Sequence, residues 1–169
     1  MKKMKRVLLA MLLTALLMSQ ASAATMMSPR YRLKTLWTRP VAQTTATNGA
    51  LSASAAEQVV AQVNAERAKA GLSALRVDAE LTRAAQVRAR EIVQKFSHTR
   101  PDGTAWNTVS ASAYGENLAM GQKTVDKAMA AWMSSSGHRA NILRASYGSI
   151  GVCCYVSGGV TYWVQLFGK

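Results

Sequence analysis

The stretch most informative about the fold is residues 136–143, which read Ser-Gly-His-Arg-Ala-Asn-Ile-Leu. Its His138 is one of only two histidines in a chain of 169 residues. The other histidine, His98, lies in an equally distinctive segment, residues 96–103, which read Phe-Ser-His-Thr-Arg-Pro-Asp-Gly. Between the two histidines, residues 115–119 read Gly-Glu-Asn-Leu-Ala and add one carboxylate. Two imidazoles and a carboxylate in such contexts predict a polar site where helices, strands and turns meet.

Residues 1–23 have the three-part layout of a secretory signal peptide. A basic start is followed by an apolar run from Val7 to Met18 and by the small residues Ala21-Ser22-Ala23. The apolar run holds 12 residues, whereas a helix needs roughly 20 to span a bilayer. We therefore predict a protein without a transmembrane segment that is secreted, to the periplasm or the extracellular space, and begins at Ala24.

Residues 24–53 are rich in small and polar side chains, which is typical of a flexible arm. Within this arm, Tyr31–Trp37 mixes aromatic and basic residues, which suits an anionic surface or a membrane interface. A disordered terminus is the simpler interpretation. The full chain carries a net charge of +13, and removing the four cations of the signal peptide leaves +9. Such a charge attracts anionic cell-wall polymers, anionic lipid headgroups or extracellular nucleic acid. For the globular part, solubility is the simpler interpretation of the charge. No specific nucleic-acid partner is predicted, and we expect a monomer.

The remaining residues, 54–169, are expected to form one domain that begins with helices. Ser54 and Glu57 are spaced as a capping box for a first helix, which Gly71 ends. Asp78 is placed to cap a second helix, which carries an apolar stripe. Its basic residues are interpreted as a solvated face; they are Arg83, Arg88, Arg90 and Lys95.

The second half of the domain is predicted to hold a surface loop, helices and a hairpin. The loop covers residues 104–114, and a helix follows from Val125 to about Met133, broken by Gly137. One further helical turn is expected at residues 139–144. Two strands joined by a glycine turn then close the chain, from Ser149 to Val156 and from Val160 to Phe167.

The only cysteines, Cys153 and Cys154, are adjacent in the first of these strands. Adjacent Cα atoms lie about 3.8 Å apart, below the usual disulfide span of about 4.4–6.8 Å. We expect two thiols, one pointing into the core and one outward, because neighbouring strand side chains alternate. A disulfide to another chain is the alternative.

The order of five motifs resembles that of the CAP superfamily. These motifs are residues 96–103, residues 115–119, Trp132, residues 136–143 and the final Tyr162–Gly168. That superfamily comprises cysteine-rich secretory proteins, antigen 5 and plant pathogenesis-related proteins, and the chain resembles its disulfide-poor bacterial branch. The resemblance covers about residues 56–168. It implies an α+β fold, a three-layer α-β-α sandwich with a small antiparallel sheet.

The resemblance also implies a cleft of two histidines and acidic residues, which holds a divalent metal in some members. Carried over by motif, His98, Glu116 and His138 are the candidate metal ligands, and Asn117 and Ser135 complete the candidate ligand cleft. Many eukaryotic members have a glutamate at the position of Ser135. With one carboxylate fewer, we expect a divalent metal such as zinc to bind weakly and exchangeably.

Two classes of function fit this cleft. The first is a secreted binding module for a small ligand or a cell-envelope polymer, such as a lipid, a glycan, a cell-wall fragment or a peptide. The second is an extracellular hydrolase, assisted by a metal or by a serine among Ser134–Ser136, with His98, Glu116 and His138 as catalytic candidates. A third interpretation is structural, because two histidines bonded to Glu116 would tie three segments together. We favour the binding module over an enzyme.

Overall fold

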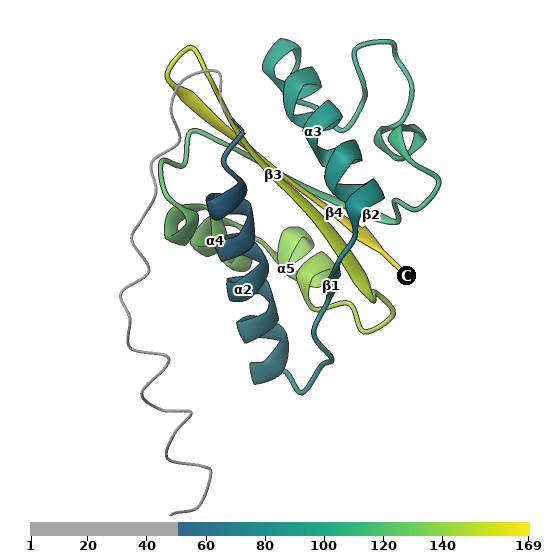
Figure 1. Ribbon diagram of the computed structural model, residues 1–169, viewed down its shortest axis with the longest axis vertical. Coiled ribbons are helices and arrows are strands. Elements are labelled where there is room, and N and C mark those ends of the chain that lie inside the picture. The colour runs from purple at the N-terminus through teal and green to yellow at the C-terminus, as the bar shows by residue number, and fades with distance from the viewer. Residues whose placement is uncertain (1–50) are drawn as a thin grey trace, which may run out of the picture. The chain divides into compact units, whose positions relative to one another are not determined.

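The computed structural model describes residues 51–169 (Figure 1). The predicted signal peptide, residues 1–23, lies outside the described residues, as does most of the predicted arm, residues 24–53, with Tyr31–Trp37. Within the described part, no helix is both long enough and apolar enough to cross a bilayer.

Helix α2, Ala53–Lys69, begins slightly earlier than the sequence pattern predicts. Its N-cap is Ser52, whose hydroxyl accepts a hydrogen bond of 3.3 Å from the N–H of Ala55. The capping box predicted at Ser54 is therefore wrong. The N–H of Ser52 also donates to the carbonyl of Cys154 at 3.1 Å. The folded domain therefore already includes Ser52.

The end of α2 and the start of helix α3, Ala79–Gln94, confirm the sequence prediction. Gly71 follows α2 with a φ of 71°, a left-handed conformation in which glycine carries no Cβ penalty. Asp78 caps α3 by accepting a hydrogen bond of 2.8 Å from the N–H of Leu81. A Cβ on Gly151 would lie 2.1 Å from the carbonyl carbon of Leu81. This glycine lets the start of α3 pack directly on the sheet.

The sheet has four strands in the order β1-β3-β4-β2. Their bounds are β1 Arg76–Val77, β2 Gly115–Met120, β3 Ser149–Ser157 and β4 Val160–Gly168. The expectation of an antiparallel sheet is wrong at one edge, because β1 pairs parallel with β3. A parallel neighbour needs a long crossover, and here the chain from α3 to helix α5, Ser136–Ile142, lies between the two strands.

The predicted β3–β4 hairpin is confirmed, with Gly158 and Gly159 at its turn. Both have positive φ values, 58° and 76°, as a two-residue turn of the favoured hairpin type requires. Helix α4, Val125–Ser134, also agrees with the sequence pattern. Its break comes at Ser135 instead of the predicted Gly137, which lies inside the short helix α5, Ser136–Ile142.

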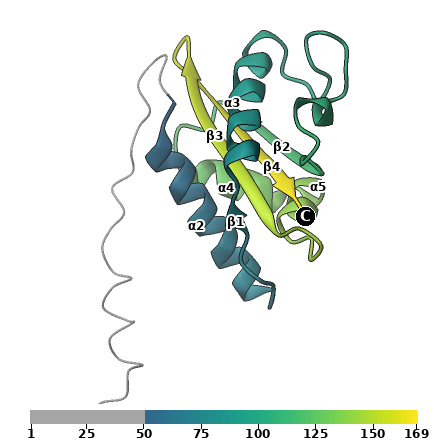
Figure 2. The same cartoon turned by 45° about the vertical axis from the view of Figure 1, so that its right-hand side comes forward.

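Helices cover both faces of the sheet, as the two views in Figures 1 and 2 show. One core lies between the sheet and α2, α4 and α5, and a second lies between the sheet and α3. The predicted α-β-α sandwich is therefore confirmed. Cys154 belongs to the first core and Cys153 to the second. The expectation of one outward thiol is wrong, because both faces are covered, and burial raises the pKa of both thiols to about 12.

Candidate functional site

His98 is held at the cleft by a tight turn after the end of α3. The N–H of Thr99 donates to the hydroxyl of Ser97 at 3.0 Å, and Thr99 pairs with Ala105 across the turn. The side chain of His98 keeps 56% of its surface exposed. The turn therefore leaves the imidazole accessible from solvent.

Glu116 lies on the edge strand β2 beneath His98 and is almost completely buried. Its Oε1 lies 2.7 Å from Nδ1 of His98, and its Oε2 accepts a hydrogen bond of 2.8 Å from Nε of Arg88. An ionised carboxylate only accepts hydrogen bonds, so Nδ1 of His98 carries the proton in this arrangement. The free nitrogen of the neutral imidazole is then Nε2. This is how an orienting carboxylate prepares a histidine to bind a metal or a ligand.

Arg88 is a site residue that the sequence analysis placed wrongly. Its side chain is fully buried, so the interpretation of Arg88 as part of a solvated face is wrong. Besides Glu116, its guanidinium bonds Glu91 at 2.6 Å and the carbonyl of Ser97 at 2.8 Å. Burial alone would lower the pKa of Arg88, but hydrogen bonds and charge from Glu116 and Glu91 raise it above the ordinary value. Arg88 therefore stays charged and neutralises Glu116.

His138 lies on α5, and its ring is half-buried. Burial lowers its pKa below the ordinary value, and the charge of His98 lowers it further. That the two imidazoles converge on one site stays a prediction. A depressed pKa favours the neutral ring, which is the form that binds a metal or accepts a hydrogen bond.

A buried amide network joins β2 to α5. The side-chain N–H₂ of Asn117 donates to the carbonyl of His138 and to Gln165, both at 3.0 Å. Asn141 in turn donates to the carbonyl of Glu116 at 3.2 Å and to Asn117 at 2.9 Å. Because Asn117 is fully buried, it positions the cleft and does not line it, contrary to the sequence prediction.

Ser135 and its neighbours lie at the junction of α4 and α5. The N–H of Ser135 bonds the carbonyl of Trp132 at 3.2 Å, and the hydroxyl of Ser134 bonds the carbonyl of Ala131 at 2.9 Å. Among residues 51–169, no hydrogen bond joins a serine of this junction to His138. The geometry therefore does not support an activated serine.

The predicted three-ligand metal set of His98, Glu116 and His138 does not form in this arrangement. Within the described part of the chain, no group of three or more histidine, cysteine or acidic side chains is placed to hold a metal ion. The physical reason is that both oxygens of Glu116 are committed, one to His98 and one to Arg88. Glu116 is instead the group that orients His98.

A hollow of about 410 Å³ opens beside His98. Its lining includes three aromatic residues, Trp106, Tyr114 and Tyr147, and one cationic residue, Arg144. Trp106 comes from the short 3-10 helix η2, Trp106–Val109, inside the predicted surface loop. Sequence reasoning missed these residues, because they lie in three separate segments.

Residues 60–167 match the model of the CAP family, described as the cysteine-rich secretory protein family. The chain belongs to this family. The chain is 38% identical over 134 residues to YkwD of Bacillus subtilis, a match that covers 74% of the chain and 52% of YkwD. The chain thus spans about half the length of this curated relative.

Two solved structures share the fold of this CAP domain. An outer surface protein from Borrelia burgdorferi has a TM-score of 0.60 and 23% identity, covering 67% of this chain and 90% of that one. NaASP2, crystallised with Zn²⁺, has a TM-score of 0.56 and 16% identity, covering 74% of this chain and 84% of that one. Identities this low show the common fold alone.

Proposed function

We propose that this CAP domain is an exported binding module that holds its ligand at the cleft around His98 and His138. The arrangement of Glu116 is the observation that carries the proposal. Its carboxylate is neutralised by Arg88 and fixed on His98, so it orients an imidazole and has no free oxygen to act as a base. Nε2 of His98 is free to act as a base, but a serine hydrolase also needs a nucleophile activated by an imidazole. Among residues 51–169, no hydrogen bond joins a serine of the α4–α5 junction to His138.

We further propose that the two imidazoles bind a divalent metal such as zinc, weakly and exchangeably. Nε2 of His98 and the neutral ring of His138 would hold the ion, as neutral imidazoles suit zinc. When bound, zinc supplies open coordination positions for an oxygen atom of a ligand. The zinc in the crystals of the fold relative NaASP2 supports a metal at a CAP domain. Two protein ligands are fewer than the three or four of resident zinc sites, which supports weak binding.

Export is part of the same proposal. The signal-peptide pattern of residues 1–23 supports it, and the Borrelia burgdorferi protein that shares the fold is an outer surface protein. A binding module outside the cytoplasm meets small ligands and cell-envelope polymers, and these are the partners we propose.

Zinc titration calorimetry tests the proposal on the exported chain. We expect weak binding that His98→Ala or His138→Ala removes, and that Ser135→Glu strengthens by adding a carboxylate. Thr99→Ala is the matched control, because it changes an exposed residue next to His98 and leaves both imidazoles in place. A chelator should strip the metal without unfolding the domain, unlike a structural zinc.

Equal zinc affinity in all of these variants would show that the imidazoles do not form a metal site. The hydrolase alternative is tested by measuring turnover of ester, peptide and glycoside substrates. Turnover that His138→Ala abolishes would contradict a binding module and favour an enzyme.

A further inference from the structure

The hollow beside His98 carries an excess of positive charge. Glu116 is the acidic residue of its wall, and Arg88 neutralises that carboxylate from the buried side. Arg144, by contrast, is exposed, and within residues 51–169 no acidic side chain pairs with it. Its guanidinium lies over the ring of Tyr147, 5.4 Å from the ring centroid. An unpaired guanidinium at the wall of a concave site favours an anionic ligand.

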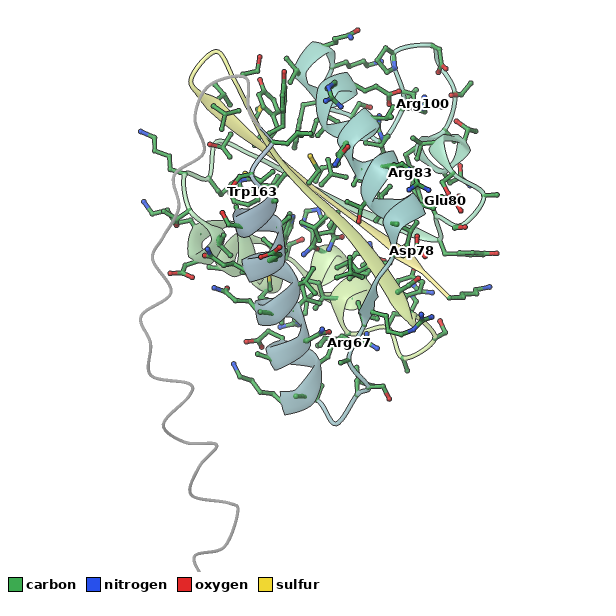
Figure 3. All side chains as sticks on the ribbon, in the orientation of Figure 1. Arg67, Asp78, Glu80, Arg83, Arg100 and Trp163 are labelled. Carbon is green, nitrogen blue, oxygen red and sulfur yellow. The ribbon has the colours of Figure 1, made fainter. Side chains whose placement is uncertain are left out.

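The backbone of the segment that carries Arg144 is held by hydrogen bonds from a buried arginine. The buried guanidinium of Arg67 on α2 (Figure 3) donates to the carbonyls of Ile142 and Arg144 at 2.9 Å and of Tyr147 at 3.2 Å. The ring of Tyr147 is buried, and it stacks on Phe167 at 5.4 Å between centroids. A ligand therefore meets a cation whose supporting backbone and ring are already ordered, which lowers the entropic cost of binding.

The lining of the hollow also offers aromatic surface. Tyr114 is half exposed, and Trp106 is partly exposed at the start of η2. The hydroxyl of Tyr147 donates to the carbonyl of Tyr114 at 2.8 Å, so these two segments of the lining are joined. Nζ of Lys169 lies 4.3 Å from the ring centroid of Tyr114. Rings of this kind pack against the apolar face of a flat or ring-shaped ligand.

We propose that this hollow is a subsite for an anionic saccharide. Arg144 binds a carboxylate or phosphate through its planar fork of N–H donors, and the sugar ring lies against Trp106 and Tyr114. The inference rests on the proposed function and deepens it, because it names the ligand class of the cleft that His98 shares.

NMR titration of the exported chain with three monosaccharides of the same ring type tests the proposal. N-acetylmuramic acid carries a carboxylate, N-acetylglucosamine 6-phosphate carries a phosphate, and N-acetylglucosamine carries neither. We expect at least one charged sugar to bind about tenfold or more tightly than the neutral one, because charge-assisted bonds are the stronger ones. Whichever charged sugar binds more tightly shows whether the site prefers a carboxylate or a phosphate.

Arg144→Gln should remove the preference for the charged sugar, and Trp106→Ala should weaken all three. Arg90→Gln is the matched control, because Arg90 also lies over a tyrosine, 5.7 Å from the ring centroid of Tyr155, but outside the hollow. Equal affinity for the three sugars would overturn the proposal, and so would equal losses in Arg144→Gln and Arg90→Gln. Binding of anionic lipid vesicles without binding of any sugar would also overturn it. Zinc affinity does not depend on Arg144, so zinc titration separates failure of this subsite from failure of the imidazole site.

Discussion

Replacing Arg88 by methionine should strongly destabilise the domain, because Arg88 is the counter-ion of a buried carboxylate. Arg88 and Glu116 have 0% and 1% of their side-chain surface exposed, and their ion pair measures 2.8 Å. Methionine keeps most of the aliphatic volume but leaves the carboxylate of Glu116 with His98 as its only side-chain partner. Breaking a buried pair in this way costs about 3–5 kcal/mol, a large part of the roughly 5–15 kcal/mol that stabilises a typical domain.

Urea unfolding of Arg88→Met, Glu116→Gln and the double variant measures this cost and the coupling of the two residues. The double variant should lose less than the sum of the single variants, because the uncompensated charge is then gone. Glu66→Gln is the control, since its pair with Lys69 is largely exposed, at 30% and 70%, and should cost at most about 1 kcal/mol. An Arg88→Met cost no larger than that of the control would refute the assignment of Arg88 as the counter-ion of Glu116.

Three further predictions concern processing, the cap of α2 and the response to acid. Mass spectrometry of exported protein should find an N-terminus at Ala24, and an intact Met1 would contradict export by a cleaved signal peptide. Deleting residues 24–50 should leave the melting temperature nearly unchanged, whereas Ser52→Ala should cost about 1 kcal/mol through loss of the α2 cap; equal effects would contradict the N-cap assignment. Burial alone would raise the pKa of Glu91, but hydrogen bonds from Arg100 and Arg88 lower it below its ordinary 4.5. Its contribution to stability is therefore complete above pH 4.5 and is lost as the pH falls through the lowered pKa, so Arg100→Gln should lose less stability on acidification than the unchanged chain.

Local sequence signals predicted those elements whose ends are set by neighbouring residues. Gly71 and Asp78 mark the end of α2 and the start of α3 because their conformation and capping chemistry act within one turn. The same kind of signal failed at Ser54, because Ser52 offers the same hydroxyl two residues earlier and also bonds β3. Strand β1 was missed, since its two exposed residues form no periodic pattern.

The site was harder to predict where a residue acts through contacts distant in sequence. The motifs around His98, Glu116 and His138 predicted that the two imidazoles and the carboxylate come together, and the structure places Glu116 against His98 at 2.7 Å. Arg88 shares the buried face of α3 with Ile92, four residues later, so its spacing was visible. Its charge favoured the wrong interpretation, because the partner that makes burial possible lies 28 residues further along the chain. Arg144 has no comparable signal in the sequence.

The central claim is that Glu116 orients His98 at a cleft where the imidazoles of His98 and His138 bind a divalent metal. A crystal structure of the exported protein grown with zinc tests this claim most directly. The account predicts zinc bound to Nε2 of His98 and to the ring of His138, with Glu116 still hydrogen-bonded to Nδ1 of His98 and to Arg88. A carboxylate oxygen of Glu116 at about 2.0–2.2 Å from the zinc, or zinc bound away from both imidazoles, would contradict it.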